Sequence, residues 1–309
     1  MGRRRKGEAV SGWIVLDKPI NLGSTQAVGQ VRRAFNAQKA GHAGTLDPLA
    51  TGVLPIALGE ATKTVPFLVD ADKAYEFTVA WGEETTTFDR EGPVIATSDI
   101  RPTPQAIQAA LARFVGEIDQ VPPAYSAIKV EGERAYDLAR EGVAVDLAPR
   151  RIVIHSAELT GAPDADHAQI AITCGKGTYV RALARDLAQA LGTKAHVSAL
   201  RRTRVGPFSA DRAAALELVA DLCDRGAGSE VLLPVETALD DIPALAVTTE
   251  DAFRLTQGRA IVLLPRQVES LRERLSPERT VAALHEGKIV ALCEMRAGRL
   301  NPTRVFNLT

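Results

Sequence analysis

GHAGTLDPLATGVLPIALGEATKT, residues 41–64, joins a loop dense in Gly and Thr to an apolar run. The apolar run, residues 53–58, is bounded by glycines, which is typical of a short buried strand. The loop before it contains one His and one Asp, His42 and Asp47. A lone Asp before a proline usually just starts a turn. Here Pro48 biases Asp47 towards an extended backbone and stiffens the loop, so a functional carboxylate is the competing interpretation.

Other strands and helices are predicted on both sides of this stretch. Aromatic, β-branched or alternating apolar residues predict strands, and apolar residues at helical spacing predict helices. The predicted strands are residues 12–16, 73–81, 151–159, 168–174 and 196–205, and the predicted helices are 24–35, with Ser24 as N-cap, 104–115 and 179–191. The order has no regular βαβ rhythm, and no GxGxxG or GxxxxGKS loop is present. We therefore expect an α/β (α+β) fold around a mixed, largely antiparallel sheet.

The chain is long enough for one large and one small domain. An acidic stretch with glycines and a proline, residues 221–236, predicts the end of the large domain and a connector. A strand-rich unit follows from about Pro243, with a hairpin turn expected at Ala297-Gly298. The predicted division is a basic N-terminal arm at 1–10, a catalytic domain at 11–240 and a small β-rich domain at 243–309.

Composition narrows the class of protein. Apolar residues make up 46% and charged residues 24% of the chain, as in ordinary globular proteins. A net charge of -1 argues against a protein that coats nucleic acid indiscriminately. Residues 181–204 nevertheless hold six Lys or Arg against one acid, which alone predicts a solvated face more often than a phosphate-binding one. Three widely spaced cysteines and no apolar run of roughly 18 residues indicate a reducing cytoplasm and no membrane span.

Residues 41–63, GHAGTLDPLATGVLPIALGEATK, resemble the central motif of the TruB family of tRNA pseudouridine synthases, which is shared in variant form with the guide-RNA-dependent dyskerin branch. Three further segments carry the resemblance: LDKP at 16–19, PPAYSAIKVEGERAYDLAR from 122, and CGKGTYVRALARDLAQALGTKAHVSALRRTRVGPF from 174. The C-terminal unit resembles the family's PUA-type RNA-binding domain. The resemblance therefore covers nearly the whole chain.

The resemblance implies an isomerase that converts uridine 55 in the tRNA T-loop to pseudouridine. The base leaves its stack, and Asp47 acts as nucleophile on either C6 of the uracil or C1′ of the ribose. The reaction is redox neutral and transfers no external group, so neither a metal nor an organic cofactor is expected. The implied partner is tRNA, contacted at the T-arm and the acceptor stem, by a cytoplasmic monomer that needs no protein partner and no membrane.

The resemblance also assigns roles to pocket residues. Tyr75 matches a catalytic residue whose ring stacks on the flipped uracil and which is expected to help move the C5 proton, although alone it would be an ordinary strand aromatic. Arg181 matches the partner of the catalytic Asp, which would keep Asp47 ionised and oriented. Without the motif it would be a surface charge. Tyr179 and Leu200 match residues that line the pocket, where core packing is the alternative for both.

Five further positions are implied as substrate contacts. His42 matches a residue that wedges into the disrupted RNA loop, which predicts remodelling of the substrate and not acid–base catalysis. Lys18, Lys63 and Lys129 match basic positions that contact phosphate or the pocket, although each alone would be a solvated charge. Asp89 matches an acid that contacts RNA near the flipped nucleotide.

Two positions depart from the family pattern. Asn21 replaces a usual Gly, which is a mild change because Asn tolerates a left-handed backbone. Thr86 replaces an acid before Asp89, which puts the detailed role of that loop in doubt. Two rivals also stay open: a guide-dependent synthase subunit and a non-catalytic tRNA chaperone. The absence of a Lys-rich tail disfavours the first, and the presence of Asp47, Tyr75 and Arg181 together disfavours the second.

Overall fold

The computed structural model describes residues 7–126, 128–130, 132–143, 145–275 and 279–308. Most of the expected basic arm, residues 1–6, lies outside the described residues. No helix in these ranges is long and apolar enough to cross a membrane.

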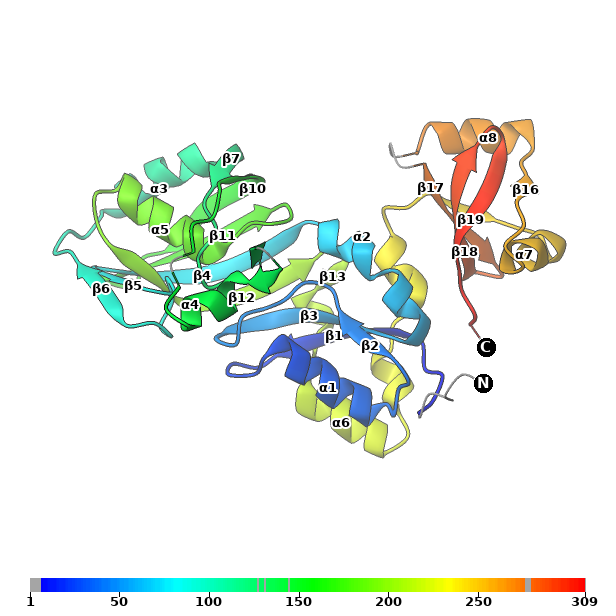
Figure 1. The fold of residues 1–309 in the computed structure, drawn as a ribbon, viewed down its shortest axis with the longest axis horizontal. Helices are drawn as coiled ribbons and strands as arrows, with labels where there is room; N and C mark the ends of the chain where they lie inside the picture. Colours follow the sequence, from blue (N-terminus) through cyan, green and yellow to red (C-terminus); the bar gives the residue numbers. More distant parts are fainter. Residues whose placement is uncertain (1–6, 127, 131, 144, 276–278, 309) are drawn as a thin grey trace.

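One large twisted sheet organises most of the chain (Figure 1). Its strands run in the order β14 (Ala214–Ala215), β1 (Gly12–Lys18), β3 (Ala50–Leu58), β12 (Ala195–Val205), β4 (Lys73–Trp81), β11 (His167–Cys174), β10 (Arg150–Gly161) and β7 (Gly116–Gln120). Two short strands join at its sides, β2 (Ala40–His42) on β3 and β13 (Phe208–Ser209) on β12. The β1–β14 and β3–β12 pairs are parallel and the others antiparallel. The predicted mixed, largely antiparallel α/β sheet is confirmed.

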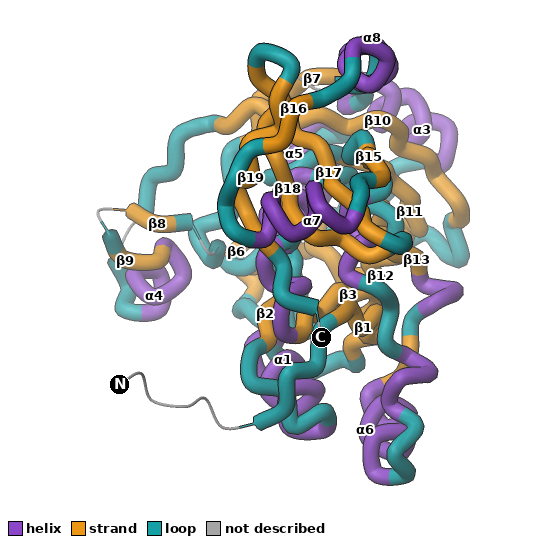
Figure 2. The backbone as a smooth tube through the Cα atoms, turned by 90° about the vertical axis from the view of Figure 1, so that its right-hand side faces the viewer, coloured by secondary structure: helices purple, strands orange, loops and turns teal. Residues whose placement is uncertain are grey.

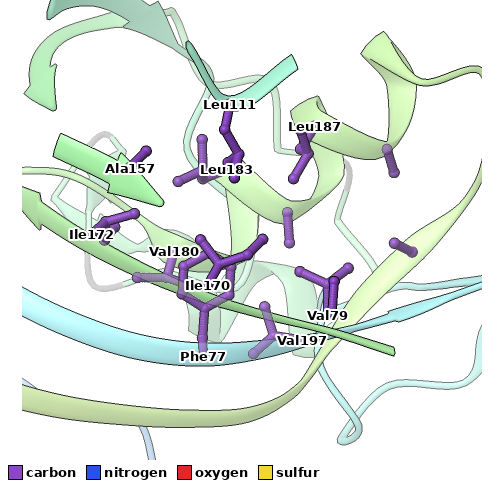
Figure 3. Close-up of a cluster of buried hydrophobic side chains, with 14 of the residues drawn as sticks. Phe77, Val79, Leu111, Ala157, Ile170, Ile172, Val180, Leu183, Leu187 and Val197 are labelled. Atoms are coloured by element: carbon purple, nitrogen blue, oxygen red, sulfur yellow. The ribbon is translucent and has the colours of Figure 1, made fainter. Parts of the chain in front are cut away.

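Two helix pairs pack against the sheet. Helices α1 (Ser24–Ala34) and α6 (Leu216–Asp224) cover β1 and β3, whereas α3 (Pro104–Leu111) and α5 (Val180–Ala190) cover β4, β10 and β11. Figure 3 shows the second layer, where Leu183 and Leu187 of α5 meet Phe77, Val79 and Ile170 of the sheet. Burying each such side chain contributes about 1.5–3 kcal/mol relative to exposure.

The helix predicted at 104–115 is shorter than expected. The α-helix ends at Leu111, and a 3-10 turn, η2 (Ala112–Phe114), completes it before Val115 becomes extended. Gly116 then starts strand β7 with φ 107°, a value that only glycine adopts without strain. The helix therefore stops early because the chain must turn into the edge strand of the sheet.

The chain ends in a second, separate sheet. Its strands run in the order β15 (Ala244–Ala246), β17 (Thr280–His285), β18 (Lys288–Arg296), β19 (Arg299–Val305) and β16 (Ile261–Val262), with helices α7 (Thr249–Thr256) and α8 (Pro265–Arg272) beside them. Viewed from the side of this unit, its strands lie in front of the main sheet (Figure 2). The expected turn joins β18 to β19, with positive φ at both Ala297 and Gly298.

Polar and apolar contacts attach the second sheet to the first. Phe306 and Ile289 belong to the same buried cluster as Trp13 of β1. The backbone amide of Asn307 donates to Glu60 Oε2 at 2.8 Å, next to the 3-10 helix η1 (Gly59–Lys63) that follows β3. The acidic stretch expected as a connector runs through this region, and Leu233 within it pairs with Trp13.

Candidate active site

A pocket of about 340 Å³ opens beside the loop that carries Asp47. Five of the predicted site residues line it together: Asp47, Tyr75, Tyr179, Arg181 and Leu200. They come from the loop before β3, from strands β4 and β12, and from the start of α5. Residues distant in sequence thus converge where the resemblance implies a single site.

The Asp47 loop is fixed on both sides of Asp47. Ser24 Oγ donates to the Leu46 carbonyl at 2.8 Å and accepts from the Leu46 amide at 2.9 Å. The Asn21 amide donates to the Pro48 carbonyl at 2.8 Å. Ser24 was expected to cap helix α1, but the cap position is Gly23, because the Ser24 hydroxyl is engaged with Leu46 instead. The loop is therefore pinned while the Asp47 side chain stays 38% exposed.

Lys18 supports the same loop from beneath. Its side chain is fully buried, and Nζ donates to the carbonyls of Pro19 (2.9 Å), Leu22 (2.7 Å) and Pro48 (3.3 Å). Burial lowers the pKa of Lys18 to about 8, and the nearby Asp47 carboxylate opposes that shift. The structure therefore places Lys18 in contact with loop carbonyls. Asn21 has φ 64°, the left-handed backbone that makes its departure from glycine mild.

Arg181 is the second residue of α5 and lies between two carboxylates. Its Nε is 3.0 Å from Asp47 Oδ2 and 3.6 Å from Asp89 Oδ2. Nη1 donates to the Thr87 carbonyl at 2.9 Å and Nη2 to the Tyr125 carbonyl at 3.0 Å. The Arg181 side chain is 7% exposed. A cation near the N-terminus of a helix opposes the helix dipole, and these two carboxylates offset that cost.

Asp89 is held by its own loop. Thr87 Oγ donates to Asp89 Oδ1 at 2.5 Å, and the Glu91 amide donates to the same oxygen at 2.9 Å. Thr85 Oγ donates to the Asp89 carbonyl at 2.6 Å. Two of the three consecutive threonines thus fix Asp89, so the loop is ordered although Thr86 replaces the family's acid.

Tyr75 and Tyr179 give the pocket its aromatic walls. Burial raises the pKa of both hydroxyls, so both stay protonated at neutral pH. The backbone of Tyr179 is tied to the buried side chain of Gln120, which accepts from its amide at 2.9 Å and donates to its carbonyl at 3.2 Å. Leu200 of β12 completes the pocket wall and also packs against the hydrophobic core. It therefore lies at the boundary between pocket and core.

Besides Lys18 and Asp89, three further predicted contact residues do not line the pocket. Lys63 Nζ bonds to Glu60 Oε2 at 2.6 Å and to the Val305 carbonyl at 2.7 Å, facing the C-terminal sheet. Lys129 is exposed on strand β8 (Lys129–Val130). His42 lies on β2, and burial together with the Arg202 charge lowers its pKa. Their contacts with RNA stay predictions.

The pocket residues that were not anticipated from the sequence include Arg202, Lys73 and Ser126. Lys73 is buried and donates to the Val69 and Ala71 carbonyls. Ser126 is 4% exposed, and its Oγ has no hydrogen-bond partner among the described residues. Strand alternation could have identified Arg202, since it lies two residues after Leu200 and so on the same face.

Histidine, cysteine and carboxylate side chains do not gather in threes anywhere in the described ranges in a way that could hold a metal ion. The three cysteines are unpaired, and burial raises the pKa of Cys174 to about 11 and of Cys293 to about 12. The chemistry available at the site is that of one accessible carboxylate, the two buried guanidiniums of Arg181 and Arg202, and two protonated tyrosines.

Comparison with known proteins places this geometry in a family. Residues 32–180 match the model of the TruB family pseudouridylate synthase N-terminal domain, and residues 181–240 match the tRNA pseudouridylate synthase B C-terminal domain. A Caulobacter sp. (strain K31) protein named tRNA pseudouridine synthase B is 68% identical over all of both chains. A Rhodospirillum rubrum protein of the same name is 52% identical, again over all of both chains.

Solved structures agree at the level of the fold. The chain is similar to one in a crystal structure of a Cbf5-Nop10-Gar1 complex, with a TM-score of 0.71, 25% identity, and coverage of 95% of this chain and 84% of that one. The chain is also similar to one in a structure of an H/ACA RNP bound to a substrate RNA. The TM-score of that pair is 0.73 and the identity 22%, and the match covers 100% of this chain and 92% of the other. With family models spanning residues 32–240 and full-length relatives at 52–68% identity, the chain belongs to the TruB family of pseudouridylate synthases.

Proposed function

We propose that this chain converts uridine 55 in the T-loop of tRNA to pseudouridine, without a guide RNA, with Asp47 as nucleophile. The observation that carries the proposal is the Asp47–Arg181 ion pair inside the pocket lined by Tyr75 and Leu200. The full-length relatives named tRNA pseudouridine synthase B support tRNA as the substrate.

The proposed reaction balances without a cofactor. The bond between N1 and C1′ breaks, a bond between C5 and C1′ forms, the C5 proton leaves and N1 gains a proton. Asp47 attacks either C6 or C1′ and is released when the new bond is made. Arg181 Nε lies 3.0 Å from Asp47 Oδ2, and this charge-assisted contact orients the carboxylate.

The remaining pocket residues bind the flipped base. Tyr75 offers a ring for stacking, an interaction of about 1–3 kcal/mol per base. Its raised pKa keeps the hydroxyl protonated, so the proposal gives Tyr75 a stacking role. Tyr179 and Leu200 complete the pocket walls, and the Asp89 carboxylate lies 3.6 Å from the same Arg181 nitrogen that contacts Asp47. The carboxylate of Asp89 thus acts on the reaction through Arg181.

The proposed RNA contacts extend beyond the pocket. His42 wedges into the opened T-loop, and its lowered pKa keeps the ring neutral at neutral pH. Lys129 contacts phosphate from its exposed strand. The sheet formed by β15 to β19 acts as a PUA-type domain, at 243–309, on the acceptor stem. We propose a cytoplasmic monomer that requires no protein partner.

A guide-dependent role is the main rival, because chains in a Cbf5-Nop10-Gar1 complex share the fold. That likeness is at 25% identity, whereas relatives that bear the tRNA synthase name match at 52–68% over the full length. The comparison favours the enzyme that acts alone. A non-catalytic tRNA chaperone would need no Asp47–Arg181 pair, although chaperone activity could accompany catalysis.

The test is tritium release from a T-arm minihelix that carries 5-tritiated uridine, incubated with the purified protein alone. Wild type should release tritium, and Asp47→Asn should bind the minihelix with similar affinity but release none. The matched control is Asp221→Asn, which removes an exposed carboxylate paired with Arg225 on α6 and should retain activity. No release from folded wild type that still binds would favour the guide-dependent or chaperone role. Normal release by Asp47→Asn would overturn the assignment of the nucleophile.

A further inference from the structure

Arg202 is a buried cation under the Asp47 loop. Its residue exposure is 1%, and the guanidinium donates to three backbone carbonyls: Nε to Val53 at 2.8 Å, Nη1 to Thr45 at 3.3 Å and Nη2 to Gly44 at 3.1 Å. None of the ion pairs formed within the described part of the chain includes Arg202. Burying a charge is costly unless hydrogen bonds compensate, so these carbonyls are what stabilises it.

The register of the sheet explains how Arg202 reaches this position. On β12 it is paired with Gly52 of β3 on one side and with Tyr75 of β4 on the other. Gly52 has φ 98°, and a Cβ there would lie 2.2 Å from the Arg202 carbonyl oxygen. Only glycine allows the two strands this approach. Lys18 of β1 is paired with the same Gly52, so two buried cations flank it in one row across the sheet.

The Asp47 loop lies over this row. Arg202 holds the loop at Gly44 and Thr45, and Lys18 holds it at Pro48. Between these points the Asp47 carboxylate meets Arg181. The planar guanidinium can bind the two adjacent carbonyls and Val53 at once, which a lysine ammonium on a flexible stem cannot do with the same geometry.

The Arg202 charge also acts on the aromatic wall of the pocket. Burial raises the pKa of Tyr75, and the Arg202 charge acts in the opposite direction. Both side chains line the pocket. Arg202 is therefore in contact with the pocket as well as with the loop.

We propose that Arg202 is a positioning residue, whose contacts with the Gly44 and Thr45 carbonyls set the placement of the Asp47 carboxylate for attack. The inference rests on the proposed function, because it assumes that Asp47 is the nucleophile. Displacing a reacting group by about 1 Å can cost about 100-fold in rate. The loss should fall on kcat, since the residues proposed to bind the base, Tyr75, Tyr179 and Leu200, are unchanged.

The experiment compares Arg202→Met and Arg202→Lys with wild type in tritium release from the T-arm minihelix. We expect Arg202→Met to lower kcat about 100-fold, with KM within about threefold of wild type. The kcat of Arg202→Lys should be about tenfold higher than that of Arg202→Met. The matched control is Arg204→Met, which removes a cation on the same strand whose side chain donates to the Gly206 carbonyl at 3.4 Å. Its kcat should stay within threefold of wild type. Minihelix affinity should be equal for Asp47→Asn and for Asp47→Asn combined with Arg202→Met.

Every other outcome counts against the proposal. A kcat within threefold of wild type for folded Arg202→Met would show that the loop is placed without Arg202. A rise in KM or loss of minihelix binding that accounts for the whole defect would make Arg202 an RNA-binding residue. Failure of both Arg202 variants to fold by circular dichroism, with Arg204→Met folded, would assign Arg202 to stability alone. Absence of tritium release from wild type would instead contradict the proposed function, which separates the two failures.

Discussion

The Arg181 guanidinium lies 3.0 Å from the Asp47 carboxylate, yet the two side chains differ in exposure, at 7% and 38%. The guanidinium is also bound to the Thr87 and Tyr125 carbonyls, so its position is fixed independently of Asp47. The buried Arg181 guanidinium therefore orients the Asp47 carboxylate, which remains accessible from the pocket.

Arg181→Lys should keep the charge but lose the planar fork that reaches both carboxylates and both carbonyls. We expect kcat to fall about 100-fold, because Asp47 loses its fixed partner and with it the near-attack geometry. Tritium release under saturating minihelix measures the change. Arg185→Lys, one turn further along α5, is the control. Its hydrogen-bond partners are Asp186 and the Val121 carbonyl, and its guanidinium lies over the Phe88 ring at 5.1 Å from the centroid. An Arg181→Lys enzyme that works within threefold of wild type would contradict the role given to the ion pair.

Two substitutions of Tyr75 separate the contribution of its ring from that of its hydroxyl. Tyr75→Phe keeps the stacking surface, whereas Tyr75→Leu removes it. Because stacking contributes about 1–3 kcal/mol per base, we expect kcat/KM of Tyr75→Leu to lie about 5- to 150-fold below that of Tyr75→Phe. Single-turnover tritium release for the two variants provides the comparison. Equal losses in both would mean that the hydroxyl, and not the ring, carries the effect.

Most of the fold follows from local patterns in the sequence. The strand expected at 73–81 is observed with those bounds, because its alternation is strong and both its ends are marked. The helix expected at 179–191 is observed as Val180–Ala190, one residue shorter at each end. Helices α6, α7 and α8 were not expected, since they are short and are stabilised by packing on elements distant in sequence.

The site was predictable only in part. The motif resemblance identified Asp47, Tyr75 and Arg181, and the structure brings them together in one pocket. The partners of the residues beneath the loop could not be foreseen: Ser24 has the features of a helix cap, and strand alternation places Arg202 on the face of Leu200 without indicating what it binds. Their partners, Leu46 and the Gly44 carbonyl, are set by tertiary register, which a single sequence does not encode locally.

The buried ammonium of Lys18 predicts a pH dependence of stability. Its pKa is about 8 in the folded protein and 10.5 for an unperturbed lysine. Between these values the unfolded chain binds more protons at this site, so Lys18 makes the free energy of unfolding rise with pH. Below pH 8 both states are protonated and this contribution is constant. Urea unfolding at pH 7.5, 9 and 10 should give a free energy of unfolding that rises less, or falls more, with pH for Lys18→Met than for wild type. An equal or more positive slope in the variant would contradict the assigned shift.

Substitution of Lys63 should raise KM more for whole tRNA than for the minihelix. It joins the two sheets by donating to the Val305 carbonyl, while its own carbonyl accepts from Arg304. If the C-terminal sheet contacts the acceptor stem, loosening this junction weakens only that contact. Loss of a hydrogen bond of about 0.5–1.5 kcal/mol predicts that Lys63→Met raises KM for whole tRNA about 2- to 12-fold, with kcat unchanged.

The T-arm minihelix, which lacks the acceptor stem, serves as the comparison substrate for Lys63→Met, and its KM should stay within twofold of wild type. Lys39→Met removes an exposed positive charge from the same side of the main sheet, where the Lys39 carbonyl accepts from the Gly59 amide, and should change neither KM. An equal rise in KM for both substrates would instead place Lys63 among the T-arm contacts, as the resemblance to the family's basic positions implies. That result would mean the junction between the sheets does not transmit binding of the acceptor stem.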